Sequence, residues 1–368
     1  MKKFYAITLL FVAAIGFSQN TTTSTQVIPT GYYNAATGTG YTLKTQLYNI
    51  IQSHTTISYS PGLWNLYVTS DKRADGKVWD IYSSCNFNFG TGTSGNQDQG
   101  SGGTSECQFF NKEHTFPKSW FNNTSSPMYS DAFHVMPTDK KVNSERGNFA
   151  YGIVGSTSYT SSNGTKKGTN IAPNAPSGMT VFEPIDEYKG DIARNYFYMA
   201  TCYQNLVAGW KNNNPNGALF LDGTSTKAYA QWALDMLYSW HVADPVSAKE
   251  IERNDAIYAV QRNRNPFIDH PEYVFQIWGT DLTLSRNNYD FATVAVYPNP
   301  SNNHRINIET EQILDQIQLI NVNGQLMQEI KNPNVQNNIY TLENLPSGFY
   351  FLKLTSDNQS TTKKVIVN

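Results

Sequence analysis

The chain has 368 residues, of which 39% are hydrophobic and 15% are charged, so it is long enough for two domains and apolar enough for a packed core. This composition excludes a globally disordered protein. The formal net charge of −2 argues against a tight, sequence-specific DNA-binding protein, because such domains are basic overall. Any affinity for nucleic acid must therefore come from a local patch.

The first 18 residues have the pattern of a secretory signal peptide. Lys2 and Lys3 precede an apolar run at residues 6–14, and small residues follow before Gln19. The run is too short to span a bilayer comfortably, and no other run approaches membrane length. We therefore expect residues 1–18 to be removed, which leaves an exported protein with no integral membrane segment.

The larger predicted domain comprises residues 41–285, after an extended, Thr-, Ser- and Gly-rich lead-in at residues 19–40. It begins with a helix at residues 43–52, and an alternating, β-rich pattern predicts a strand at residues 76–82. Residues 86–106 are rich in Gly and Ser and are expected to form a mobile surface loop. Residues 108–110 then lead, as a strand, into Glu113 and His114.

The second half of this domain is predicted to be mainly helical. The chain is expected to be loop-like between Asn148 and Phe182. Four helices then follow, at residues 190–205, at 228–241, from just after Pro245 to about 262, and at 271–278. Ser247 and Glu250 have the spacing of a capping box at the start of the third helix.

The composition changes at about Thr293, after an expected linker at residues 286–293. The tail, residues 294–368, predicts a small all-β, sandwich-like domain with no clustered chemistry. Its strands are expected at residues 294–297, 305–308, 317–321, 325–330, 348–354 and 364–367. Asn323-Gly324 is a strong signal for a two-residue hairpin turn.

The three cysteines matter because export permits disulfide formation. Cys85 and Cys107 flank the loop at residues 86–106, and pairing them would stabilise the fold by roughly 3 kcal/mol if the geometry permits. Cys202 is then left over, in a segment expected to be a buried helix. Three unpaired cysteines are the alternative, and the sequence leaves both open.

Residue types suited to phosphodiester hydrolysis are concentrated between residues 112 and 148. The reaction needs a base for the water, positive charge at the phosphate and help for the leaving oxygen. His114 suits the base, since the unperturbed pKa of histidine is about 6.5. A hard cation such as Mg²⁺ or Ca²⁺ would accept oxygen ligands from Glu113 and Asn148. Arg146 is a second catalytic candidate, and Lys118, Arg194 and Arg264 are candidates for phosphate binding.

Structural alternatives stand beside these roles. Glu113 could be a surface carboxylate paired with Lys112, and Asn148 could cap a turn after Gly147. The remaining alternatives are ion pairs: Arg146 with Asp131 or Asp139, and Arg194 with Asp191 at a helical i,i+3 spacing.

Several ordered motifs resemble the bacterial endonuclease I family, within the ββα-metal (His-Me finger) group. They are residues 112–117 (KEHTFP), 130–134 (SDAFH) and 142–149 (VNSERGNF), followed by 188–194 and 261–267. The resemblance implies an α+β fold with a ββα-metal core wrapped by helices. It also implies His114 as general base and Glu113 and Asn148 as ligands of Mg²⁺, with Ca²⁺ or Mn²⁺ as alternatives. Some members place a phosphate-contacting Arg in the region that corresponds to residues 122–129, which contain none here.

The tail resembles the C-terminal sorting domain of type IX secretion cargo, on residues 296–300, 323–325, 345–350 and 363–367. This implies export by the type IX secretion machinery, followed by release or attachment to the outer-membrane surface. We therefore predict a secreted, monomeric, metal-dependent endonuclease that cuts DNA and also RNA without sequence preference. The alternatives are a secreted ribonuclease with little activity on DNA and a non-catalytic surface protein that captures nucleic acid.

Overall fold

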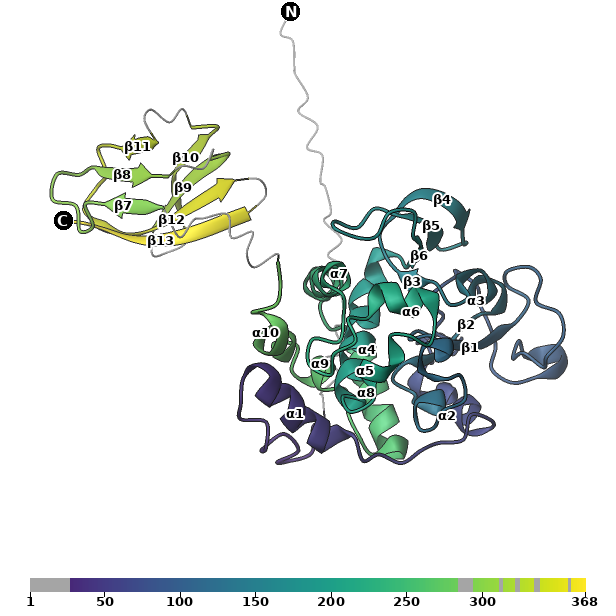
Figure 1. Ribbon diagram of the computed structural model, residues 1–368. Helices are drawn as coiled ribbons and strands as arrows, with labels where there is room; N and C mark the ends of the chain where they lie inside the picture. Colours follow the sequence, from purple (N-terminus) through teal and green to yellow (C-terminus); the bar gives the residue numbers. More distant parts are fainter. Residues whose placement is uncertain (1–26, 284–293, 311–313, 322–324, 334–337, 357–358) are drawn as a thin grey trace, which may run out of the picture.

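A computed structural model describes residues 27–283, 294–310, 314–321, 325–333, 338–356 and 359–368 (Figure 1). The expected signal peptide, the linker at residues 286–293 and the Asn323-Gly324 turn lie outside the described residues. Among the helices that are described, none combines the length and hydrophobicity needed to cross a bilayer.

The core of the larger domain surrounds one buried helix, α4 (Lys189–Cys202), whose residues from Gly190 to Cys202 are all buried (Figure 1). Helices α1 (Gly40–Ile51), α7 (Gln231–Ala243) and α9 (Pro266–Asp269) pack against it, and α8 (Ala248–Gln261) packs on α2 (Gly62–Ser70). The shorter helices are α5 (Val207–Trp210), α6 (Pro215–Phe220) and α10 (Tyr273–Trp278). A helix buried on all sides needs no polar face, because other elements cover its whole surface.

The predicted long helices are confirmed within a few residues at their ends. Helix α8 begins with the expected capping box, in which the Ser247 side chain and the Glu250 side chain each bond to the other residue's backbone N–H. Helices α2, α3, α5, α6 and α9 were not predicted, because they are too short to show an amphipathic period.

A strand–strand–helix unit lies at one side of the larger domain (Figure 1). Strand β1 (Phe110–His114) pairs antiparallel with β2 (Val135–Asp139), and α3 (Lys140–Arg146) follows β2 without a loop. Asp139 caps α3, since its side chain accepts hydrogen bonds from the backbone N–H groups of Lys141 and Val142. The ββα arrangement expected within an α+β domain is therefore present.

A second sheet occupies the segment that was expected to be a loop. Its four strands are β3 (Ala150–Tyr151), β4 (Val154–Thr160), β5 (Lys166–Asn170) and β6 (Thr180–Glu183), in the order β3-β6-β5-β4. Most residues of β4 are exposed and small or polar, so the strand has no alternating apolar pattern that sequence reasoning could detect.

The strand predicted at residues 76–82 is wrong. This segment forms an isolated bridge between Lys72 and Val78 but no ladder. The residues alternate in the sequence, yet Val78, Ile81 and Tyr82 are all buried. The β-like composition reflects burial on several sides and not pairing within a sheet.

The tail forms two antiparallel sheets around its own hydrophobic core, which confirms the all-β prediction. One sheet has the order β10-β9-β12-β13 and the other β11-β8-β7. The strands are β7 (Ala295–Tyr297), β8 (Ile306–Glu309), β9 (Gln316–Asn321), β10 (Leu326–Lys331), β11 (Ile339–Leu342), β12 (Gly348–Ser356) and β13 (Gln359–Val367). Strand β11 was not predicted.

Candidate active site

One cavity of about 530 Å³ gathers most of the predicted site residues. It is formed mainly by β1, by α3 and by the residues that follow each of them, and Tyr59 is added from the segment before α2. Its lining consists of Tyr59, Asn111, Lys112, Glu113, His114, Pro117, Lys118, Ser119, Asn143, Arg146, Gly147 and Asn148. The volume is in the range of roughly 300–1,000 Å³ that is typical of ligand sites.

His114 is the last residue of β1, and its side chain is held by the backbone of another segment. Its Nε2 lies 2.9 Å from the carbonyl oxygen of Tyr129. A carbonyl only accepts, so Nε2 carries the proton and the lone pair of the neutral ring is on Nδ1. Burial, reinforced by His134, lowers the pKa of His114 well below its usual value. The ring is therefore neutral at neutral pH and able to take up a proton.

Glu113 lies beside His114 and also lines the cavity, although its residue is only 2% exposed. Its Oε1 accepts a hydrogen bond of 2.9 Å from the Tyr82 hydroxyl and lies 2.9 Å from Nη1 of Arg146. Burial raises the pKa of Glu113 to about 7, against the lowering effects of Arg146 and Tyr82. Neighbours in a strand normally face opposite sides, but β1 ends at His114, and both residues reach one cavity.

Arg146 links this carboxylate to the backbone of the same segment. Besides the ion pair with Glu113, its Nη1 donates to the carbonyl of His114 at 2.7 Å and its Nη2 to that of Thr115 at 2.6 Å. The alternative that Arg146 pairs with Asp131 or Asp139 is wrong, because its carboxylate partner is Glu113. The guanidinium is buried and engaged with protein groups, so the geometry favours a supporting role at the base of the cavity over contact with phosphate.

Asn148 and Lys118 lie on more accessible parts of the cavity lining. Gly147 ends α3 with a positive φ of 56°, and Asn148 follows it with an exposed side chain. Its Oδ1 accepts a hydrogen bond of 3.0 Å from Nδ2 of Asn216 in α6. Lys118 is exposed, and its Nζ lies 5.9 Å from the ring centroid of Tyr129. Among the described residues no carboxylate forms an ion pair with it, so its ammonium group is available for an anion.

The structure places Arg194 and Arg264, the two arginines predicted to bind phosphate, away from the cavity. Both guanidinium groups are buried and neither lines the cavity. Arg194 makes two bonds to Glu250, of 2.6 and 2.8 Å, in place of the alternative partner Asp191. Arg264 makes two bonds to Asp269, also of 2.6 and 2.8 Å. Each charge is matched by a buried carboxylate, as a buried charge requires.

Several residues of the lining, chiefly Lys112 and Tyr59, were not predicted as site residues. The Nζ of Lys112 lies 3.5 Å from the ring centroid of Trp64 and 4.4 Å from that of Tyr59. Burial lowers the pKa of Lys112 to about 8. Lys112 adjoins Glu113 in the sequence and was weighed there only as an ion-pair partner, whereas nothing near Tyr59 indicates that it reaches this site.

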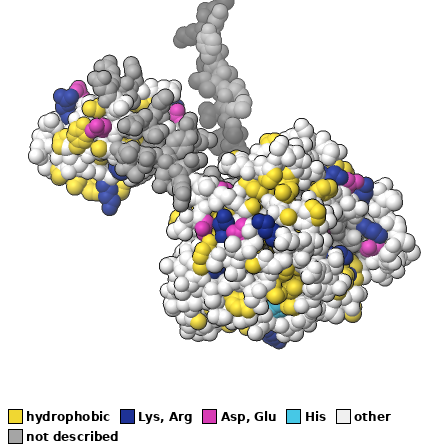
Figure 2. Space-filling view, in the orientation of Figure 1, with side chains coloured by type: hydrophobic (Ala, Val, Ile, Leu, Met, Phe, Trp, Pro, Cys, Tyr) yellow, Lys and Arg dark blue, Asp and Glu magenta, His cyan; other side chains and the backbone are white. Residues whose placement is uncertain are grey.

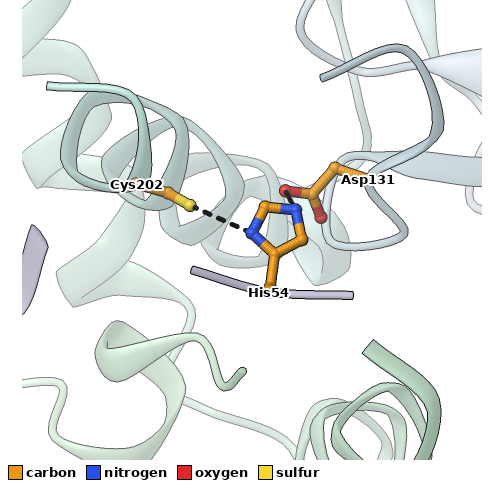
Figure 3. A group of neighbouring side chains, drawn as sticks. All are labelled: His54, Asp131 and Cys202. Carbon is orange, nitrogen blue, oxygen red and sulfur yellow. Dashed lines mark hydrogen bonds and ion pairs between the residues drawn. The ribbon is translucent and has the colours of Figure 1, made fainter. Parts of the chain in front are cut away.

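Of the two alternatives for the cysteines, one disulfide and one free thiol is the one that the structure contains. Cys85 and Cys107 form a disulfide, and Cys202 is free and buried in α4. Figure 3 shows the ring of His54 between Cys202 and Asp131. Its Nδ1 is 3.9 Å from the sulfur and its Nε2 is 3.8 Å from a carboxylate oxygen.

This buried trio supports the active site indirectly. The carboxylate of Asp131 accepts hydrogen bonds from Tyr198, Tyr203, Gln261 and the backbone of Phe133. Because two different nitrogens of His54 face the two partners, the arrangement is a chain of contacts and not a shared ion site. Asp131 therefore anchors the segment that carries Tyr129, whose carbonyl orients His114.

The donor groups in the cavity fit a hard divalent cation. Glu113 offers a carboxylate and Asn148 an amide oxygen, which are the ligand types that Mg²⁺ and Ca²⁺ prefer. The Tyr82 hydroxyl and the Arg146 guanidinium both contact Oε1 of Glu113, so this oxygen is already engaged with protein groups. A cation would also favour the ionised form of this buried carboxyl, whose pKa burial raises.

The surface offers little positive charge elsewhere in the view of Figure 2. Charged side chains of the described residues lie in small mixed groups on this face of the larger domain, without a continuous basic patch. This agrees with the net charge of −2.

Comparison with known proteins finds matches for both parts of the chain. The family model described as Endonuclease I matches residues 39–272, and the model described as a secretion system C-terminal sorting domain matches residues 295–368. The chain is 35% identical over 255 residues to an extracellular ribonuclease of Bacillus amyloliquefaciens. It is 34% identical over 252 residues to an extracellular ribonuclease of Bacillus subtilis (strain 168). Each alignment covers 67% of this chain and 78% of the relative.

Proposed function

The chain belongs to the endonuclease I family and is a secreted phosphodiester hydrolase, and on that premise we propose that it is a metal-dependent endonuclease that cuts DNA and RNA without sequence preference. One observation carries the proposal. A single cavity contains an imidazole with a defined tautomer, a buried carboxylate and an exposed amide. The same set speaks against a non-catalytic protein that only captures nucleic acid.

His114 is the general base in this mechanism. The Tyr129 carbonyl holds its ring through Nε2, so Nδ1 accepts the proton of the attacking water. Arg146 keeps the backbone of His114 and Thr115 in place through their carbonyls. Burial keeps the ring neutral, which is the form that a general base requires.

Glu113 and Asn148 would hold the divalent ion, with Mg²⁺ preferred and Ca²⁺ or Mn²⁺ as alternatives. When bound, the ion supplies Lewis-acid stabilisation of the leaving oxygen. Asn216 holds the amide of Asn148 with its Nδ2. Lys118, and Lys112 beside it in the cavity, provide positive charge for the phosphate, in a chain that has no Arg at residues 122–129.

Contacts of this kind address the sugar–phosphate backbone and not the base edges. Binding should therefore tolerate any sequence and weaken as salt increases. Digestion of plasmid DNA and total RNA should give a continuous range of fragment lengths, and the extent of digestion of both substrates should fall as the salt concentration rises. Sharp, sequence-specific bands would contradict the proposal.

The decisive test combines metal removal with a variant. After EDTA treatment activity should vanish, and titration with Mg²⁺, Mn²⁺ or Ca²⁺ should restore it. His114→Ala should lose cleavage by about 100-fold or more, the usual minimum for removal of a general base, while binding of nucleic acid is retained. Unchanged cleavage in this variant would show that the base is another group.

A second candidate is a ribonuclease with little activity on DNA. It is favoured by the names of the two relatives, which are both called extracellular ribonucleases. Digestion of single-stranded DNA, duplex DNA and RNA at equal nucleotide concentration separates the two candidates. A preference for RNA over single-stranded DNA of the same sequence would select the ribonuclease.

The proposal extends to the domain organisation. Residues 1–18 are the signal peptide, residues 41–285 the catalytic domain, and residues 294–368 the sorting domain that engages the type IX secretion machinery. The secreted enzyme acts as a monomer. Mass spectrometry of the protein recovered from the medium would reveal where the signal peptide is removed and whether residues 294–368 are still attached.

A further inference from the structure

Two stacked tyrosines stand beside the proposed general base. The ring centroids of Tyr59 and Tyr129 are 4.3 Å apart, with 22° between the ring planes. The ring of His114 lies 5.8 Å from Tyr59 and 5.3 Å from Tyr129, at 13° and 22°. Both tyrosines are partly exposed, and Tyr59 lines the cavity. A group of nearly parallel rings therefore adjoins the imidazole of His114.

A lysine accompanies each tyrosine. The Nζ of Lys112 is 4.4 Å from the ring centroid of Tyr59, and the Nζ of Lys118 is 5.9 Å from that of Tyr129. Both distances are within the roughly 6 Å at which a cation is attracted to an aromatic face. Both lysines also line the cavity. We refer to Tyr59, Tyr129, Lys112 and Lys118 as the tyrosine ledge.

The depth of the site limits what can reach it. The residues His114 and Glu113 are 6% and 2% exposed, so a reacting phosphate has to enter the cavity. In a duplex each base is stacked between its neighbours and paired, so its faces are covered. An unpaired nucleotide can turn its base outward and stack it on an aromatic side chain.

Elsewhere on the cavity wall, the lining residues are polar, small or buried. Apart from Tyr59, the lining contains no tyrosine, tryptophan or phenylalanine among the described residues. Tyr129 extends this aromatic surface through its stacking on Tyr59. Two aromatic rings and two ammonium groups are complementary to a nucleotide, since the base can stack on a ring and the phosphate on each side of it can bind an ammonium group.

We propose that the tyrosine ledge binds the base of an unpaired nucleotide next to the scissile phosphate, so that the enzyme prefers single-stranded nucleic acid to duplex. The inference rests on the proposed function, since it assumes that the phosphate is cut at His114. Every base has a π-face, so stacking of this kind is compatible with sequence-tolerant cleavage. The same chemistry serves unpaired RNA and unpaired DNA.

Binding can be measured without cleavage in the full-length protein in EDTA. Fluorescence anisotropy would use single-stranded DNA and RNA of roughly ten nucleotides, within the site sizes of single-strand-binding proteins, together with a blunt duplex. A stacked base contributes about 1–3 kcal/mol, so Tyr59→Leu should weaken single-strand binding by roughly 5- to 150-fold. Tyr59→Phe, which keeps the ring, should bind as the wild type does, and duplex binding should be the same in all three.

Two controls keep the result interpretable. Tyr48→Leu removes a partly exposed tyrosine of α1 that is outside the cavity, and should leave binding unchanged. A strand in which abasic sites replace the bases should bind the wild-type protein as weakly as the intact strand binds Tyr59→Leu. This second control needs no variant, so it remains valid even if Tyr59→Leu is poorly folded.

Equal weakening on single strands and duplex, or equal binding of abasic and intact strands by the wild type, would overturn the inference. Loss of binding in Tyr59→Phe would also overturn it, because the hydroxyl and not the ring would then be responsible. If Tyr59→Leu weakens the binding of DNA and RNA strands alike, the tyrosine ledge binds the base, as proposed. A response confined to RNA would place recognition at the ribose and would reject stacking. Each of these failures leaves cleavage by His114 intact, so it is distinct from a failure of the proposed function.

Discussion

Arg146 is a catalytic candidate by its sequence motif, but its bonds to Glu113 and to the carbonyls of His114 and Thr115 favour a supporting role. We consider Arg146→Met, which keeps much of the side-chain length and removes the charge. The variant loses two charge-assisted hydrogen bonds, to the carbonyls of His114 and Thr115. It also leaves Glu113 buried without its partner. Breaking a buried ion pair from one side typically costs about 3–5 kcal/mol.

The orphaned carboxyl limits this cost. Burial already raises the pKa of Glu113 to about 7, so the group can take up a proton at neutral pH and avoid a buried, uncompensated charge. For a domain of this size, about 2–4 °C of Tm per kcal/mol converts the unreduced cost into a fall in Tm of roughly 6–20 °C, and protonation of Glu113 places the expected fall toward the lower end of this range. Thermal unfolding followed by circular dichroism would measure it. Cleavage should also fall, because the segment that holds His114 loses its anchors.

Arg73→Met is the matched control. The Arg73 side chain is 40% exposed and pairs with the exposed Asp75 at 2.7 Å. Exposed ion pairs contribute about 0–1 kcal/mol, so the control should unfold within a few degrees of the wild type. If Arg146→Met matches the control in Tm, and only its affinity for nucleic acid falls, Arg146 is a phosphate ligand and our reassignment is wrong.

Three further predictions concern stability and metal use. Replacing Cys85 and Cys107 by serine should lower the unfolding free energy by about 3 kcal/mol, since their disulfide closes a loop with a sequence separation of 22; denaturant titration would measure this, and an unchanged midpoint would contradict it. Burial raises the pKa of Asp80 to about 7 from a usual value of 3.8, so the folded protein keeps a proton that the unfolded chain releases between these values. The unfolding free energy should therefore fall as pH rises from 3.8 to about 7. Urea titrations of Asp80→Asn should show a weaker decline over this range. An equal decline in the wild type and the variant would assign the pH dependence to other groups. Asn216→Ala removes the donor that holds Asn148, so the metal concentration for half-maximal cleavage should rise roughly 10-fold or more, and an unaltered metal titration would exclude this role.

Local sequence was sufficient for much of the architecture. The amphipathic period predicted α1, α4, α7 and α8, and the capping box at Ser247 marked the start of α8. The motif around His114 located the cavity, because β1 and the residues after it supply seven of the twelve lining residues. Strand β4 was missed because its stability comes from pairing with β5 and not from an apolar face.

What the sequence by itself determined is the chemistry available near His114 and the division into a helical domain and a β-rich tail, since both depend on residues close together in the chain. Only the tertiary structure decided that the candidate arginines Arg146, Arg194 and Arg264 are buried and paired with carboxylates. The guanidinium groups of Arg194 and Arg264 could bind phosphate by their chemistry. In the fold they are instead paired with the buried carboxylates of Glu250 and Asp269. Tyr59 likewise reaches the cavity from a distant segment. The energy of a buried charge or ring depends on its partners in space, and the folded backbone selects those partners.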